Sequence, residues 1–359
     1  MSSGERPDPA ELAFPGDGEM AQRMRAYPWE SSPLGNPQDW PASLRTACRI
    51  CLTSRFPMII WWGEELRFFY NDAYLPLLGN KHPATVRPGR QVWSEIWDTI
   101  GPMLESVMRS GRATWSEDLL LPMNRHGYWE ETYWTYSYSP LHDDDGTVRG
   151  VFTAVRDTTE QVVGRRRLAV LQDLGARAGH ARSVAEACDL VVQALERAQE
   201  VVPFAAIYLR GQEGTDAVLT KSSPPDTVPS PRPDGPGGWP TDEVLRDGRP
   251  VTLNDVTVRF GELPAGGWQT SPSQAMVLPL RAESGQPAGA IVLAASAGRV
   301  LDEAYSSFLH LVAQQTAALV NGAVAYQAQL RRAEELAELD RPRRRSSPTS
   351  AMNSAPRSP

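Results

Sequence analysis

The stretch RFFYNDAY, residues 67–74, determines how the first half of the chain folds. Its first four residues, 67–70, are mostly aromatic, which is typical of a short buried β-strand. Asn71 and Asp72 come next, and a side-chain oxygen of either residue can accept hydrogen bonds from the free amides at the start of a helix. We therefore predict a strand that ends in an Asn-Asp-Ala turn, from which a helix begins.

The sequence around this stretch predicts a mixed α+β domain. Strand-like runs occur at residues 56–62, 113–122, 129–139 and 148–156, with a helical stretch at 94–110. Asp145-Gly146 lies between the last two runs and is a strong signal for the tight turn of an antiparallel hairpin. Side chains alternate across residues 131–138, which indicates a sheet with one aromatic and one polar face.

The second half of the chain predicts another α+β domain. Helical composition at residues 165–199 is followed by a strand at 204–210 and by a loop rich in Pro and Gly at 222–240. Strand-like runs at 275–281 and 289–296 enclose the turn Ser284-Gly285-Gln286-Pro287, as in a hairpin.

Residues 301–340 are predicted to form one long helix that dimerises. Six of its apolar residues keep the alternating four- and three-residue spacing of a two-stranded coiled coil. These residues are Leu319, Ala323, Tyr326, Leu330, Ala333 and Ala337. We therefore expect a homodimer joined through the C-terminal helix.

These patterns divide the chain into five segments. Residues 1–40 are rich in Pro, Gly, Ser and acidic side chains, and we expect them to be mostly disordered. Residues 41–165 form the first domain with its entry helix, and residues 166–325 form the second. Residues 326–341 are the coiled-coil helix, and residues 342–359 are a low-complexity tail that we expect to be disordered.

Composition and charge narrow the classes of protein. No apolar run approaches the roughly 18 residues that cross a membrane, so no membrane span is expected. Residues 1–20 lack the features of a signal peptide, and the expected location is the cytoplasm. The net charge of -7 argues against a nucleic-acid partner. Cys48 and Cys51 have a C-x-x-C spacing, but no second cysteine pair follows, so helix packing is favoured over a metal or redox site.

Four further motifs accompany RFFYNDAY in a characteristic order. They are Pro33-Leu34-Gly35, Ser54-Arg55-Phe56-Pro57, Trp61-Trp62-Gly63 and Arg156-Asp157-Thr158-Thr159-Glu160. On these motifs, residues 31–165 resemble the PAS region of bacterial hybrid-type sensor histidine kinases. The resemblance implies that the last strand is coupled to an outgoing helix. It also implies a set of residues that relay a signal: Asn71, Asp72, Asp157, Thr158 and Thr159.

Residues 166–325 resemble a GAF domain. The resemblance rests on Val277-Leu278-Pro279-Leu280, on the strand-turn-strand unit that this run opens, and on the helix from Phe308 to Val320. The Pro-rich loop from Ser222 departs from the compact core of that family. Together the two resemblances imply a PAS-like domain followed by a GAF-like domain, joined and ended by long helices.

Aromatic residues of the first domain predict a ligand cavity. Apolar and aromatic walls suit a small apolar or aromatic molecule, and simple core packing is the alternative. The candidates are Trp61, Trp62, Phe69, Tyr70, Trp134 and Tyr136, and Trp93 and Trp97 belong to the same aromatic set.

No cofactor is predicted for either domain. Residues 56–156 contain no cysteine for a flavin adduct. His82 is expected in a loop and His126 in a turn, and neither position suits an axial ligand of haem. Cys188 lacks the neighbouring histidine that a bilin-attaching cysteine would favour.

Residues 341–359 contain a recognisable pattern when their codons are read in another frame. When allowed codons for residues 341–359 are read one base out of frame, they encode Ala-Lys-Thr-Ala-Phe-Phe-Ser-Asn-Val-Ser-His-Glu-Phe-Arg-Thr-Pro-Leu. This peptide resembles the phosphoacceptor helix of the sensor kinases. We therefore expect that a frameshift truncates the chain just before that helix, and a natural short tail is the alternative.

Together these features predict the signal-sensing input module of a two-component sensor histidine kinase. The chain itself is expected to have no catalytic domain and no metal site, and its partners would be a histidine kinase or a response regulator. A stand-alone regulatory or dimerisation protein that acts on a partner kinase is the alternative. An enzyme that uses Asp118, Glu130, Glu131 or residues 143–145 is disfavoured, because carboxylates in turns and on polar sheet faces are usually solvated.

Overall fold

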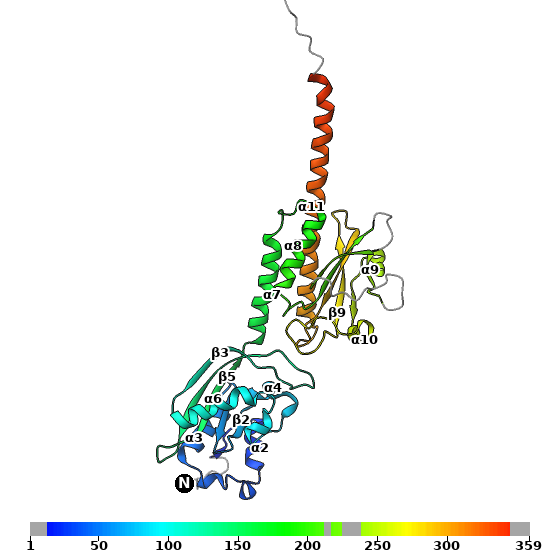
Figure 1. Ribbon diagram of the computed structural model, residues 1–359. Coiled ribbons are helices and arrows are strands. Elements are labelled where there is room, and N and C mark those ends of the chain that lie inside the picture. The colour runs from blue at the N-terminus through cyan, green and yellow to red at the C-terminus, as the bar shows by residue number, and fades with distance from the viewer. Residues whose placement is uncertain (1–12, 212–216, 225–237, 345–359) are drawn as a thin grey trace, which may run out of the picture. The chain divides into compact units, whose positions relative to one another are not determined.

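The computed structural model describes residues 13–211, 217–224 and 238–344, with the side chains of residues 339–344 left aside. The chain forms two compact units that meet in sequence at Arg165 and Arg166 (Figure 1). In the described ranges, no helix is long and apolar enough to cross a membrane.

The first unit is built on a five-stranded antiparallel sheet. Its strands are β1 (Met58–Trp62), β2 (Arg67–Tyr70), β3 (Thr114–Leu120), β4 (Tyr133–His142) and β5 (Val148–Asp157), in the order β2-β1-β5-β4-β3. The helices are α2 (Glu19–Ala26), α3 (Ala42–Thr53), α4 (Leu75–Leu78), α5 (Gly89–Val92) and α6 (Trp97–Ser110). The predicted strand at residues 67–70, the helical stretch near 94–110 and the β4–β5 hairpin are all present.

Both faces of this sheet are covered. One face packs on α6, with Trp61, Phe68 and Trp134 in that core. The other face packs on α3 and on residues 13–40, with Trp62 and Phe69 in a second core. Successive side chains of a strand point to opposite faces, so the neighbours Trp61 and Trp62 belong to different cores.

The prediction that residues 1–40 are mostly disordered is wrong for residues 13–40. Phe14, Trp29 and Trp40 are buried against the sheet, with the Trp29 and Trp40 rings 4.9 Å apart. The Trp29 indole donates a hydrogen bond to the Met24 carbonyl at 2.7 Å. Each buried aromatic stabilises the fold by about 1.5–3 kcal/mol, which a composition dominated by polar residues conceals. Residues 1–12 lie outside the described part.

The second unit contains another five-stranded antiparallel sheet. Its strands are β6 (Ala205–Arg210), β7 (Ala217–Ser223), β8 (Val251–Leu253), β9 (Ala275–Arg281) and β10 (Pro287–Ala294), in the order β7-β6-β10-β9-β8. One face packs on α8 (Val184–Glu196) and α11 (Glu303–Arg344). The other face packs on α9 (Thr241–Asp247) and α10 (Val256–Phe260). Most of the predicted Pro-rich loop, residues 225–237, lies outside the described part.

The helical region predicted at residues 165–199 consists of two helices. α7 (Thr159–Ala176) ends before Gly179, whose φ is +80°, and α8 begins after Ser183. The Ser183 hydroxyl accepts a hydrogen bond from the Glu186 amide at 3.2 Å, and the Glu186 carboxylate accepts one from the Arg182 amide at 2.8 Å. This reciprocal cap fixes the start of α8.

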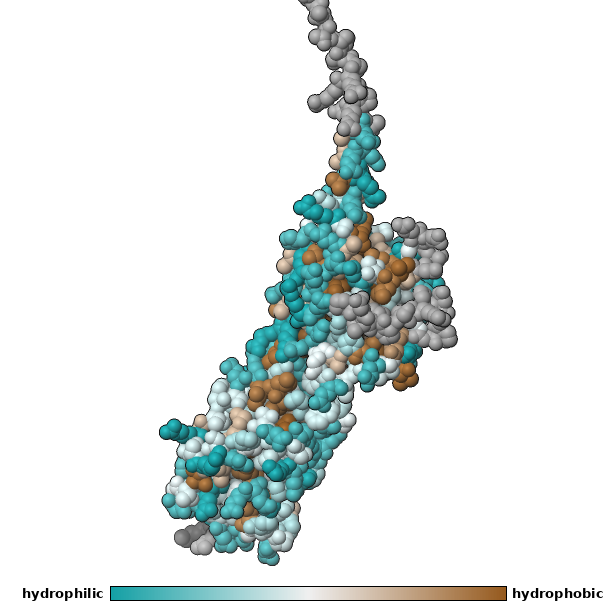
Figure 2. Space-filling view, viewed as in Figure 1, coloured by the Kyte–Doolittle hydropathy of each residue, from teal (hydrophilic) through white to brown (hydrophobic). Residues whose placement is uncertain are grey.

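The long C-terminal helix is present as α11, but two of the six residues of the predicted coiled-coil seam are buried. Leu319 and Ala323 are 2% and 1% exposed because they pack into the core of the second unit. Beyond Ala323 the helix leaves the core, and Leu330 and Leu336 are exposed. Figure 2 shows this last part as mostly hydrophilic with small hydrophobic spots. α11 continues to Arg344, three residues into the predicted disordered tail, and residues 345–359 lie outside the described part.

Candidate functional site

Three of the predicted relay residues join the sheet of the first unit to its outgoing helix. The Asp157 carboxylate accepts a hydrogen bond from the Thr159 amide at 2.9 Å, next to the start of α7. The Thr159 hydroxyl accepts one from the Tyr133 amide at 2.9 Å, and the Thr158 amide donates to the Tyr133 carbonyl at 2.9 Å. The end of β5, the start of β4 and the first turn of α7 are therefore bonded to one another.

Asp118 adds a second tie between the sheet and α7 that the sequence did not reveal. It lies in a bulge of β3, with a φ of +47°, and its amide donates to the Thr135 hydroxyl at 3.0 Å. Its carboxylate accepts a hydrogen bond from the guanidinium of Arg165 on α7. The neighbouring Thr158 and Arg165 side chains hold the pKa of Asp118 below its ordinary value, so the carboxylate stays ionised.

Asn71 and Asp72 act differently from the prediction that they cap their own helix. Asn71 is fully buried, and its amide group donates to the carbonyls of Ser54 and Phe56 at 3.1 and 2.8 Å. Its side-chain oxygen accepts from the Met58 amide at 3.1 Å. Asn71 therefore holds the loop between α3 and β1.

Asp72 caps a different helix, α2. Its two carboxylate oxygens accept hydrogen bonds from the Glu19 and Met20 amides, each at 2.8 Å. A Cβ at Gly18 would lie 2.3 Å from the Asp72 carboxylate, so a larger residue at this position would displace the carboxylate from the helix. Asp72 thereby fastens the N-terminal segment to the domain.

His82 reinforces the attachment of α2. Its Nε2 lies 2.9 Å from the Glu19 carboxylate, and its Nδ1 lies 2.8 Å from the Tyr70 hydroxyl. Glu19 also pairs with Arg23 at 2.7 Å, and hydrogen bonds from Arg23 and His82 lower the pKa of the Glu19 carboxyl. Tyr70, a predicted cavity residue, therefore serves this contact.

The interior cavity of the first unit is small. Its volume is about 30 Å³, which is room for about one water molecule. Trp61, Trp134 and Tyr136 line it, and the Trp61 indole donates to the Thr153 hydroxyl at 3.0 Å. The six predicted aromatics do not form one site, because Trp62 and Phe69 lie on the opposite face of the sheet and Tyr70 is not in the lining. Other lining residues that the prediction did not include are Ile59, Tyr74, Ile96, Ile100, Leu121, Met123, Tyr138 and Val155, with Trp93 from the wider aromatic set.

The acidic residues considered for catalysis are engaged in structural contacts. Glu130 is buried and pairs with Arg125 at 2.8 Å and His126 at 3.0 Å. Burial raises the pKa of Glu130, but the hydrogen bond and charge of Arg125 outweigh it, and the net shift is downward. Glu131 accepts a hydrogen bond from the Tyr133 hydroxyl at 2.9 Å.

The cysteines are structural as well. Cys48 and Cys51 lie in the core beneath residues 13–40, and Cys188 lies in the core of the second unit. Burial raises the pKa of Cys51 to about 12 and that of Cys188 to about 11, so both stay protonated thiols near neutral pH. Among the residues described, no group of three or more His, Cys, Asp or Glu side chains could hold a metal ion.

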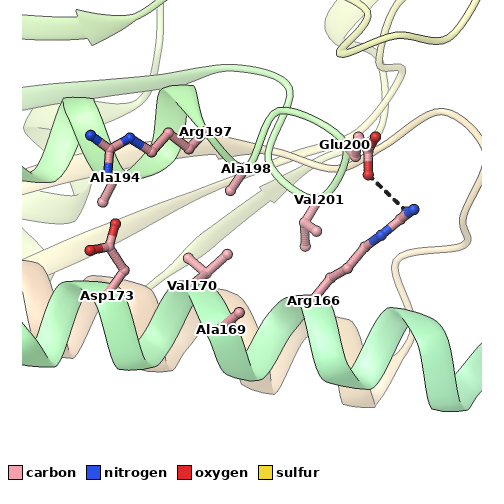
Figure 3. A pocket seen from close by; sticks show the side chains of 9 residues that line it. All are labelled: Arg166, Ala169, Val170, Asp173, Ala194, Arg197, Ala198, Glu200 and Val201. Carbon is pink, nitrogen blue, oxygen red and sulfur yellow. Dashed lines mark ion pairs between the residues drawn. The ribbon is translucent and has the colours of Figure 1, made fainter.

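The second unit has a surface groove of about 280 Å³ between α7 and the end of α8 (Figure 3). Arg166 pairs with Glu200 at 3.0 Å at one end, and Asp173 and Arg197 lie at the other end. Its apolar lining consists of small side chains: Ala169, Val170, Ala194, Ala198 and Val201. The sequence contained no signal for this groove, because it depends on how two helices pack.

Comparisons with known proteins identify both units. Residues 58–163 match the family model of the PAS fold, and residues 181–321 match that of the GAF domain. No curated protein matches the chain. The PAS-like and GAF-like resemblances drawn from the motifs are thus confirmed at the level of fold.

Several solved structures are similar to parts of the chain. The GAF domain of a phosphoenolpyruvate-protein phosphotransferase from Acinetobacter is 18% identical, with 44% of this chain and 95% of that chain covered and a TM-score of 0.33. Its counterpart from Coxiella burnetii is 19% identical, with 46% and 98% covered and a TM-score of 0.34. A sensory box sensor histidine kinase from Vibrio cholerae is 16% identical, with 28% and 77% covered and a TM-score of 0.23. With both family matches in place, the chain carries a PAS domain followed by a GAF domain, the make-up of a sensory region.

Proposed function

We propose that this chain is the signal-sensing input module of a two-component sensor histidine kinase and has no catalytic domain of its own. The observation that carries this proposal is the bonding of the PAS sheet to α7. Asp157, Thr158 and Thr159 connect β4 and β5 to the first turn of that helix, and Asp118 connects β3 to it through Arg165. A shift of the sheet would therefore be passed to the helix that leads into the GAF domain.

The module would respond to a small apolar or aromatic molecule. The lining of the PAS interior supports this ligand class, since it is aromatic and aliphatic with few polar groups. A cavity of about 30 Å³ is too small for such a molecule, so binding would have to select a more open conformation of the sheet and α6. We place the module in the cytoplasm as a homodimer joined through α11, with a histidine kinase or a response regulator as partner.

A fusion of this chain to the phosphoacceptor and ATP-binding region of a sensor kinase tests the proposal. Autophosphorylation of the fusion should respond to a compound that raises the melting temperature of the PAS domain. Thr159→Val removes the bond to the Tyr133 amide and should abolish the response while compound binding persists. Thr220→Val alters a hydroxyl of β7 that donates to the nearby Val218 carbonyl, and should leave the response intact. A Thr159→Val fusion that responds fully would contradict the proposed relay.

A stand-alone regulatory protein that acts on a partner kinase is the second candidate. Leu330 and Leu336 favour it, because they are 50% and 67% exposed on the last part of α11 and are available to another helix. Co-purification of the chain with a full-length kinase, and loss of that kinase in a Leu330→Glu variant, would support this candidate.

A further inference from the structure

A long part of α11 contains no charged side chain, although one side of this part is exposed. From Ala304 to Leu330 the sequence has no Asp, Glu, Lys or Arg. The inner side of this stretch, including Val312 and Leu319, lies in the GAF core. An ordinary surface helix carries charged and polar residues on its outer side. The fold of one chain therefore leaves the uncharged outer side of α11 unexplained.

The residues on this outer side keep the period of a coiled coil. Their spacing alternates between four and three residues, and we call the set the outer stripe: Leu311, Gln315, Ala318, Gly322, Ala325 and Gln329. Leu311, Ala318 and Gly322 are exposed, and Leu336 continues the stripe two heptads after Gly322. The outer stripe is distinct from the seam predicted from the sequence, because Leu319 and Ala323 of that seam are buried.

Gly322 is the least expected residue of the outer stripe. Glycine in the middle of a helix is unfavourable relative to alanine, so its presence there calls for a reason. Among the residues that the structure describes, a Cβ at Gly322 would meet no atom within 4 Å, so they supply no such reason. The close approach of a second helix would supply the reason, because helix axes come nearest where the contacting side chains are small.

We propose that the outer stripe is the surface on which a second copy of this chain docks, with the two α11 helices parallel. This inference rests on the proposed homodimer and specifies which face of the helix forms it. In a parallel two-fold contact each residue lies opposite its own counterpart, so any charge would face a like charge. The absence of charge from Ala304 to Leu330 removes that repulsion and fits a copy of the same helix better than a charged partner.

Cysteine cross-linking of the full chain tests this surface with a matched control. Leu311 and Val324 are 44% and 47% exposed, and they lie on different sides of α11. The native cysteines are buried and should stay inert. A short bis-maleimide should join two copies of Leu311→Cys, while Val324→Cys should remain uncoupled. Coupling of Val324→Cys in place of Leu311→Cys would overturn the proposed face.

A charge placed in the outer stripe gives a second, independent readout. Ala318→Glu should raise the dissociation constant of the dimer at least about tenfold in sedimentation equilibrium, whereas Val324→Glu should leave it unchanged. Both positions are exposed, so both variants should fold with an unchanged circular dichroism spectrum. A dimer that tolerates Ala318→Glu, or a monomeric wild type, overturns this inference. Neither result affects ligand binding by the PAS domain, which thermal shift measures separately.

Discussion

Asp72 shows how one carboxylate can attach a whole segment. It satisfies two free amides at the start of α2, from a position more than fifty residues further along the chain. A carboxylate also suits the positive end of the helix dipole. Because α2 belongs to the segment that covers the outer face of the sheet, this contact stabilises the second core of the PAS domain as well as the helix.

We expect Asp72→Ala to destabilise the PAS domain by about 1–2 kcal/mol, the usual cost of losing a helix cap. The variant should also speed hydrogen exchange at the Glu19 and Met20 amides, because their acceptor is gone. Urea unfolding and exchange mass spectrometry measure the two effects. Asp39→Ala changes an exposed carboxylate and is the matched control. Equal unfolding midpoints for the two variants would contradict the cap.

The buried thiols make a prediction about pH. Burial raises the folded-state pKa of Cys51 to about 12, above the unfolded value of about 8.5. The neutral thiol is therefore favoured by folding, and its contribution to stability is complete below pH about 8.5 and declines as the pH rises further. At pH 8 a thiol reagent should leave the native chain unmodified and react fully after addition of urea. Rapid labelling of the native protein would show that these residues are accessible, and Val324→Cys provides the reactive comparison.

At the scale of elements, features encoded by neighbouring residues were predictable and long-range contacts were not. The β9–β10 hairpin follows from a local turn, and β2 follows from four aromatic-rich residues. The packing of residues 13–40 depends on a few aromatics separated by polar residues, so composition indicated disorder. The six aromatics predicted to line one cavity could not all do so. Trp61 and Trp62 are adjacent, and a strand directs adjacent side chains to opposite faces of its sheet. The bond from Asp118 to Arg165 left no local pattern at all.

The Asp118–Arg165 pair should hold the first turns of α7 against β3 in a pH-dependent way. The folded-state pKa of Asp118 lies below its ordinary value, so the stabilisation is complete above pH about 4 and is lost as the pH falls through the folded-state pKa. Asn adopts left-handed backbone conformations readily, so Asp118→Asn keeps the backbone and removes the charge. In this variant the backbone amides of residues 160–165 should exchange hydrogen with solvent faster than in the wild type at pH 7.

The control for this pair is Arg149→Gln, which breaks another ion pair of the same domain, in which the Arg149 guanidinium lies 3.5 Å from the Asp143 carboxylate. It should leave exchange in α7 unchanged, because Arg149 lies outside that helix. If Asp118→Asn and the wild type exchange alike at every pH, the pair does not hold the helix.

At the scale of the whole molecule, the two units have separate cores and should respond separately to core mutations. Trp93 is 1% exposed in the PAS core, and Leu309 is fully buried in the GAF core. Truncation of either leaves a cavity, and the typical cost is about 3–5 kcal/mol for Trp→Ala and about 2–5 kcal/mol for Leu→Ala. We expect calorimetry to resolve two transitions, with Trp93→Ala lowering one melting temperature and Leu309→Ala the other.

The continuous helix α7 is the element that could couple the two domains, since it contributes Val170 and Leu174 to the GAF core and is bonded to the PAS sheet at Thr159. A single transition that both variants lower equally would mean that α7 makes the two domains one cooperative unit, and the relay would then act through global stability instead of through a local shift of the helix.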